Sequence, residues 1–165
     1  MSSALVVDNP AGVDPAVAGF IFLEARLADE SRYSQWESLW DEDALYWVPM
    51  HPDDDPEHTV SYINDNRRRL KSRVAQLNTG VRHSQTPPSV IRRVLGNLEV
   101  LSVQGDVTTV GANFALYEYR HMLTTWAGRY VYRVRTGTPS GPRLAGKTVH
   151  LVNAGGAIPT MSFLI

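Results

Sequence analysis

Histidines and carboxylates are the side chains in this sequence from which a metal site would be built. His51 and His58 flank an acidic, proline-broken segment, HPDDDPEH, at residues 51–58. Nitrogen and oxygen ligands of this kind bind divalent cations. However, no pair of them lies on a rigid element at metal-ligand spacing, so we interpret the segment as a solvated acidic loop. The remaining histidines lie in three separate segments and are interpreted as structural or interfacial: His83, His121 and His150.

General acid–base catalysis is a second chemistry that these residues allow. A curled sheet with helices in its mouth makes an apolar pocket, into which Glu118, Tyr130 or His150 would point. Nothing in their spacing brings these side chains together. A stand-alone isomerase, dehydratase or cyclase acting on a small molecule, or a ligand-binding protein without turnover, is therefore the alternative hypothesis.

Composition excludes several other classes of protein. The net charge is −1, so bulk electrostatics attract neither nucleic acid nor an anionic membrane. The basic run at residues 66–73, NRRRLKSR, keeps a helical apolar period and is interpreted as a solvated helix face or as one salt-bridged to a partner. The absence of cysteine excludes a disulfide, a thiolate nucleophile and a cysteine-ligated metal centre. No signal peptide and no apolar run of about 18 residues is visible, so we expect a cytoplasmic protein.

Four long strands are predicted in succession, at residues 90–103, 107–120, 124–135 and 143–152. Each is rich in Val, Leu, Tyr, Phe and Thr, and turn residues such as Gly105 separate them. Short connections favour antiparallel neighbours, which gives a meander. Because each strand twists right-handedly, strands of this length curl and leave a hollow that other elements must fill.

The first half of the chain supplies these elements. After an N-terminal arm (residues 1–13), Asp14-Pro15 predicts a helix start with an apolar stripe that ends near residue 30. The pattern then predicts a short helix at 33–39, a strand at 44–48 and a helix at 63–77. The expected fold is one α+β domain over residues 14–165, a cone-shaped curved antiparallel sheet with the N-terminal helices packed in its hollow.

The face of the sheet that points away from the helices is unusually apolar and basic. In a monomer with one solvent-exposed sheet face, apolar and polar residues would alternate more regularly along each strand. Aromatic and arginine side chains are instead typical of protein interfaces. The apolar run MSFLI at residues 161–165 would be a liability if exposed. We therefore expect an obligate oligomer. The predicted interface residues are Tyr117, Tyr119, Arg129, Arg133, Phe163, Leu164 and Ile165.

Several segments together resemble the small (β) subunit of bacterial aromatic-ring-hydroxylating dioxygenases of the Rieske type. They include FLEARLADE at residues 22–30, DALYWVP at 43–49, Gly128-Arg129-Tyr130 and SFLI at 162–165. The resemblance implies a fold like that of nuclear transport factor 2 (NTF2-like, or cystatin-like). It also implies partners: a large α subunit, and other copies of this chain in a β3 trimer within an α3β3 hetero-hexamer.

In that family the Rieske [2Fe-2S] cluster and the mononuclear Fe(II) belong to the α subunit. The resemblance therefore implies no catalytic, cofactor-binding or metal-binding residue in this chain, which agrees with its lack of cysteine. The leading hypothesis is a non-catalytic structural subunit. Such a subunit assembles and stabilises the terminal oxygenase used in the degradation of aromatic compounds.

Overall fold

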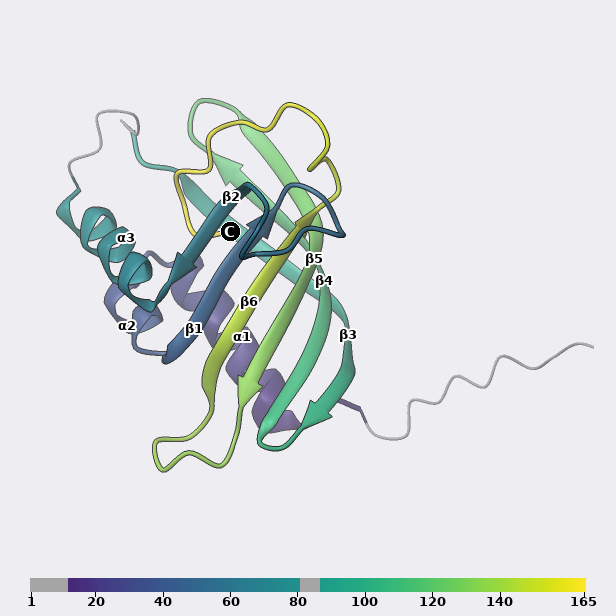
Figure 1. Ribbon diagram of the computed structural model, residues 1–165. Coiled ribbons are helices and arrows are strands. Elements are labelled where there is room, and N and C mark those ends of the chain that lie inside the picture. The colour runs from purple at the N-terminus through teal and green to yellow at the C-terminus, as the bar shows by residue number, and fades with distance from the viewer. Residues whose placement is uncertain (1–11, 81–86) are drawn as a thin grey trace, which may run out of the picture.

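The computed structural model describes residues 12–80 and 87–165, and it shows a strongly curved sheet with helices on its concave side (Figure 1). The elements in chain order are α1 (Pro15–Asp29), α2 (Tyr33–Glu37), β1 (Trp40–Pro49), β2 (Ser61–Asn66), α3 (Arg67–Thr79), β3 (Val90–Gln104), β4 (Val107–Tyr119), β5 (Leu123–Arg135) and β6 (Arg143–Leu151). The six strands are ordered β2-β1-β6-β5-β4-β3, so the sheet curls without closing. The α+β class and the curved sheet around a hollow are confirmed.

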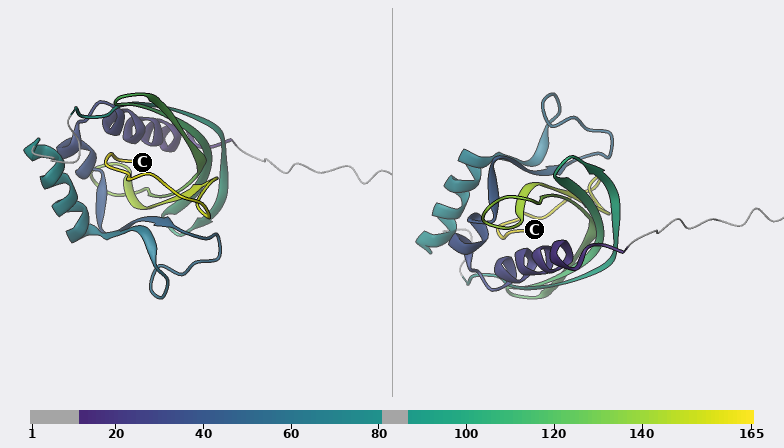
Figure 2. Two further views of the ribbon diagram at one scale, coloured as in Figure 1. Left: turned by 90° about the horizontal axis from the view of Figure 1, so that it is seen from above. Right: turned by 90° about the horizontal axis from the view of Figure 1, so that it is seen from below.

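The meander is confirmed as well. Strands β3 to β6 pair as consecutive antiparallel neighbours, and their bounds lie within one residue of the predicted ones. Gly105, with a φ of 60°, makes the tight turn between β3 and β4. The strands bend around α1, which lies inside the curve when the molecule is viewed along the axis of the hollow (Figure 2).

The prediction of a purely antiparallel sheet is wrong at one pair. Strand β1 runs parallel to β6, with Tyr46 opposite Lys147, and antiparallel to β2. A parallel pair requires a crossover, and here the whole chain between β1 and β6 provides it. Strand β1 also begins at Trp40, four residues earlier than predicted.

Residues 61–66 form strand β2 and not the start of a helix, which corrects the predicted helix at 63–77. Ile63 is buried as expected, but it lies opposite Val48 in the sheet. Helix α3 begins only at Arg67, where the Asn66 side chain accepts a hydrogen bond from the backbone N–H of Arg69. Pairing with β1 therefore decides the structure of this segment.

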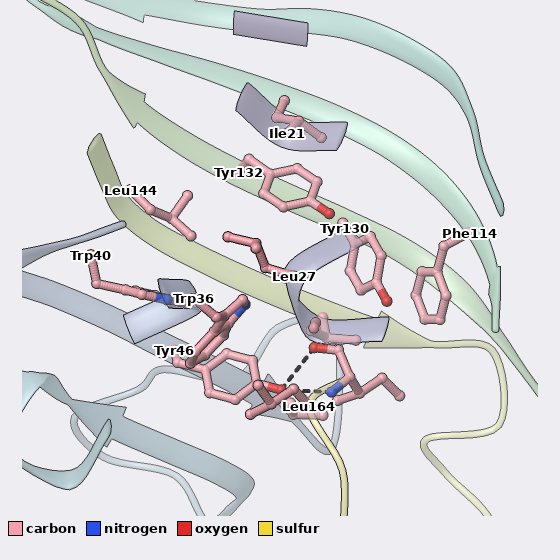
Figure 3. Packing of buried hydrophobic residues seen from close by; sticks show 14 of the residues in the cluster. Ile21, Leu27, Trp36, Trp40, Tyr46, Phe114, Tyr130, Tyr132, Leu144 and Leu164 are labelled. Atoms are coloured by element: carbon pink, nitrogen blue, oxygen red, sulfur yellow. Dashed lines mark hydrogen bonds between the residues drawn. The ribbon is translucent and has the colours of Figure 1, made fainter. Parts of the chain in front are cut away.

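Helix α1 begins as predicted, with the Asp14 side chain accepting a hydrogen bond from the backbone N–H of Ala16 at 2.7 Å. Its apolar stripe packs onto the concave face of the sheet, and the aromatic side chains of the core meet there (Figure 3). Phe114 and Tyr130 stack with their ring centroids 3.9 Å apart. The expected arm at residues 1–13 lies outside the described residues except for Gly12 and Val13, and so does His83.

Candidate functional site

The hollow of the sheet contains a buried ion pair between α1 and β6. Lys147 Nζ lies 2.9 Å from Glu24 Oε1, and both side chains are fully buried. Trp36 Nε1 donates to the same carboxylate at 2.8 Å, and the Tyr132 hydroxyl donates to Oε2 at 3.4 Å. Because every group in this cluster has a partner, the buried charges are compensated.

A second buried pair lies next to the first and joins β3 to the end of α1. Arg93 Nε donates to Asp29 Oδ1 at 2.8 Å, and the backbone N–H of Arg93 donates to Oδ2 at 2.9 Å. Arg93 Nη1 donates to the Tyr130 hydroxyl at 3.0 Å. The buried guanidinium therefore holds the concave face of the sheet to α1.

The last three residues lie inside this same hollow. Leu164 and Ile165 are 1% and 0% exposed, and the Phe163 ring packs edge-on against Trp126 with centroids 5.5 Å apart. Tyr46 lies beside Leu164 in Figure 3, and its hydroxyl donates a hydrogen bond to the backbone oxygen of Ile165 at 2.8 Å. Residues 163–165 were predicted to lie at a subunit interface, and within the single chain they are covered by their own fold.

The electrostatics of the first pair keep both partners charged at neutral pH. Burial acts to raise the pKa of Glu24, but the Lys147 ammonium and the Arg93 guanidinium together lower it below its ordinary value of 4.5. Burial lowers the pKa of Lys147 to about 8, against the opposing attraction of Glu24. The cluster thus has the properties of a structural ion pair.

The three side chains considered for acid–base catalysis do not meet. Tyr130 points into the core and is bound to Arg93. Glu118 lies further along the sheet, where it accepts hydrogen bonds from the Ser89 hydroxyl at 2.6 Å and from Trp126 Nε1 at 2.9 Å. His150 lies opposite Arg129, a residue of the outer face, where burial and that guanidinium lower its pKa. The geometry therefore brings together no acid–base pair from this set.

Two surface pockets also contain none of Glu118, Tyr130 and His150. One, of about 470 Å³, lies between α1 and α2 and is lined by Leu23, Arg26, Leu27, Glu30, Arg32, Gln35, Ser38 and Leu39. The other, of about 520 Å³, lies at the start of α3 and is lined by Glu37, Glu42, Asn66, Arg67, Arg68 and Lys71. Both lie outside the hollow of the sheet, which side chains and residues 163–165 fill.

The acidic loop is ordered by its own hydrogen bonds. Asp54 accepts from the backbone N–H groups of Met50 and His51, and Asp55 pairs with the ring of His58 at 2.8 Å. Among residues 12–80 and 87–165, no group of three or more His, Asp or Glu side chains is arranged to hold a metal ion. In the same part of the chain, no helix is long and apolar enough to cross a membrane.

The outer face of the sheet presents the other predicted interface residues. Tyr117 and Tyr119 are 42% and 56% exposed, and Arg133 is exposed on the neighbouring strand. Arg129 is half-buried and bonded within the chain, to Asn113 at 3.1 Å and to Glu99. These side chains share one surface, and their place at a subunit interface stays a prediction.

The sequence interpretation missed the charged residues of the hollow, although one signal was present. Glu24 falls within the apolar stripe of α1, at a helical spacing from Ile21 and Ala28. A charged residue at such a position indicates a buried partner. The sequence did not show which residue is the partner of Glu24, because Lys147 follows 123 positions later.

Comparison with known proteins decides the family. The sequence model described as "Ring hydroxylating beta subunit" matches residues 23–155. The chain belongs to the family of ring-hydroxylating beta subunits. It is 30% identical over 144 residues to the 2-halobenzoate 1,2-dioxygenase small subunit of Burkholderia cepacia, covering 83% of this chain and 87% of that protein. It is also 28% identical over 160 residues to the biphenyl 2,3-dioxygenase subunit beta of Rhodococcus jostii, covering 86% and 84%.

Solved structures agree with this family. The beta subunit of the benzoate 1,2-dioxygenase from Burkholderia mallei matches with a TM-score of 0.76 and 25% identity, over 93% of this chain and 99% of that one. An NTF2-like protein with a cystatin-like fold from Novosphingobium aromaticivorans shares the fold alone, with a TM-score of 0.55 and 18% identity. The resemblance stated from the sequence is thereby confirmed. These relatives are subunits of aromatic-ring dioxygenases, which are oxidoreductases.

Proposed function

We propose that this chain is the structural subunit of an aromatic-ring-hydroxylating dioxygenase, and that it assembles and stabilises an α3β3 terminal oxygenase in the cytoplasm. A large α subunit supplies the Rieske [2Fe-2S] cluster, the mononuclear Fe(II) and the aromatic substrate pocket. Three copies of this chain form the β3 trimer. The observation that carries the proposal is the family match over most of the chain, joined to a hollow filled by its own residues.

The outer face of the sheet is the proposed contact surface with partner subunits. Tyr117 and Tyr119 supply exposed aromatic area, which is a common source of interface energy. Arg133 supplies an exposed cation, and Arg129 fixes the surface through its bonds to Glu99 and Asn113. Residues 163–165 act from inside, by holding the sheet in its curved shape.

Co-expression with the α subunit encoded in the neighbouring reading frame tests the assembly. Native mass spectrometry should find three copies of each chain, and iron–sulfur absorption should accompany the α chain only. Arg133→Glu should weaken assembly at least tenfold, while Arg68→Glu on the exposed face of α3 leaves it unchanged. A chain that stays monomeric beside its partner, or that binds iron stoichiometrically by itself, contradicts the proposal.

A further inference from the structure

Buried side chains of the hollow form hydrogen bonds with the backbone of residues 164 and 165. Arg93 Nη2 donates to the backbone oxygen of Leu164 at 2.6 Å. Lys147 Nζ and the Tyr46 hydroxyl donate to the backbone oxygen of Ile165 at 3.0 and 2.8 Å. The backbone N–H of Ile165 donates to the Tyr46 hydroxyl at 3.1 Å. These backbone groups are thus satisfied by buried side chains and not by a neighbouring strand.

The donors come from three strands, and the two cations among them are also held by carboxylates outside residues 163–165. Arg93 on β3 is held by Asp29, and Lys147 on β6 is held by Glu24. Each cation then directs one remaining N–H group toward a backbone oxygen. Because both carboxylates are already used, the hollow offers two directed donors for the backbone oxygens of residues 164 and 165.

Apolar contacts complete the recognition. Phe163 packs against Trp126, and the next two side chains belong to the same core cluster as α1 and the sheet. The segment that leads to them, from Val152 to Thr160, contains no helix or strand and is largely exposed. Residues 163–165 are therefore buried at the end of an exposed connecting loop, which tethers them to the rest of the chain.

We propose that the hollow is a binding site for a short, extended apolar peptide, and that residues 163–165 are its built-in ligand. The loop keeps these residues at a high effective concentration, so a free peptide does not compete with them in the intact chain. The site accepts an external peptide of the same chemistry once its own segment no longer fits. This inference concerns the chain alone and does not depend on the proposed assembly.

Peptide binding to a full-length variant tests the proposal. Phe163→Ser, Leu164→Ser and Ile165→Ser together remove the apolar anchors and leave Arg93, Lys147 and Tyr46 in place. The probe is Met-Ser-Phe-Leu-Ile with a fluorophore on its N-terminal amine, and fluorescence anisotropy measures its binding. We expect saturable binding to the triple variant, binding at least tenfold weaker when Lys147→Met is added, and no binding to the unsubstituted chain.

The matched control peptide has serine in place of its last three residues and should not bind. Absence of binding to a triple variant whose circular dichroism is unchanged would overturn the proposal. Binding of benzoate in preference to the peptide would also overturn it, because the site would then recognise a small carboxylate.

A measurement on the unsubstituted chain applies even if the triple variant does not fold. Amide hydrogen exchange of Ile165 should be protected, yet at least tenfold faster than that of Tyr130 in the centre of β5. Such a difference means that the segment leaves its site without global unfolding. Equal exchange rates for the two amides would make residues 163–165 an inseparable part of the core and would refute the proposal.

Discussion

Glu24 on α1 and Lys147 on β6 form an ion pair at 2.9 Å with both side chains fully buried, and this pair joins the first helix to the last strand. Removing one partner leaves an uncompensated charge in the core. We therefore expect Glu24→Gln or Lys147→Met to lower the free energy of unfolding by about 3–5 kcal/mol. Urea denaturation followed by tryptophan fluorescence measures this change.

The double variant Glu24→Leu/Lys147→Met distinguishes pairing from simple loss of packing. It should be less destabilised than either single variant, because no unpaired charge remains. Lys71→Met on the exposed side of α3 serves as the control and should change stability by no more than about 0.5 kcal/mol. Additive costs in the double variant would show that the two charges act independently.

The lowered pKa of Lys147 predicts an unusual dependence of stability on pH. The unfolded chain keeps this proton up to the ordinary pKa of 10.5, whereas the folded chain releases it at about 8. Between these values the unfolded state binds more protons, so this group makes the free energy of unfolding rise with pH. Above about pH 10 the buried tyrosines act in the opposite direction, because burial raises the pKa of Tyr46, Tyr130 and Tyr132.

Urea unfolding at about pH 7.5, 8.5 and 9.5 tests this dependence, with Glu24→Leu/Lys147→Met as the reference. The stability of the unsubstituted chain relative to that reference should increase over this range. A constant difference would mean that Lys147 keeps its ordinary pKa in the folded state.

The four strands of the meander were predictable because their signals are local. Alternating β-branched and aromatic residues mark the strands, and residues such as Gly105 mark the turns between them. Helix α1 was predictable for a similar reason, since Asp14-Pro15 carries both a cap and a helix start. For these elements tertiary packing agrees with local preference.

The parts that were not predictable depend on contacts between distant residues. Ile63 stands at a helical distance from Leu70, and only its pairing with Val48 makes it part of a strand. The parallel β1–β6 pair and the burial of residues 163–165 likewise arise from contacts of β1 with segments about 100 positions later in the sequence. The apolar run at residues 161–165 predicted an interface, and a local pattern could not show that the fold of the chain itself covers residues 163–165.

Arg93 offers a test of the second buried pair by a substitution that keeps its charge. A lysine cannot reach Asp29, Tyr130 and the backbone oxygen of Leu164 at once, so buried acceptors lose their donors. We expect Arg93→Lys to cost about 3 kcal/mol or more of unfolding free energy. The adjacent Arg92 is exposed on the other face of the same strand, and Arg92→Lys should cost less than about 0.5 kcal/mol. Equal effects of the two substitutions on thermal unfolding would contradict the bonding described for Arg93.

Two glycines within the strands provide a matched pair for the close approach of β5 to β6. A Cβ added at Gly128 would lie 2.0 Å from the backbone oxygen of His150, so β6 would have to move. A Cβ added at Gly96 meets nothing within 4 Å. We expect Gly128→Ala to destabilise the chain by about 3 kcal/mol and Gly96→Ala to change stability by less than about 1 kcal/mol. Thermal unfolding of both variants measures the difference. A tolerated alanine at position 128 would show that β6 moves away from β5 at little cost, and the ion pair that β6 carries through Lys147 would then also be less rigidly placed.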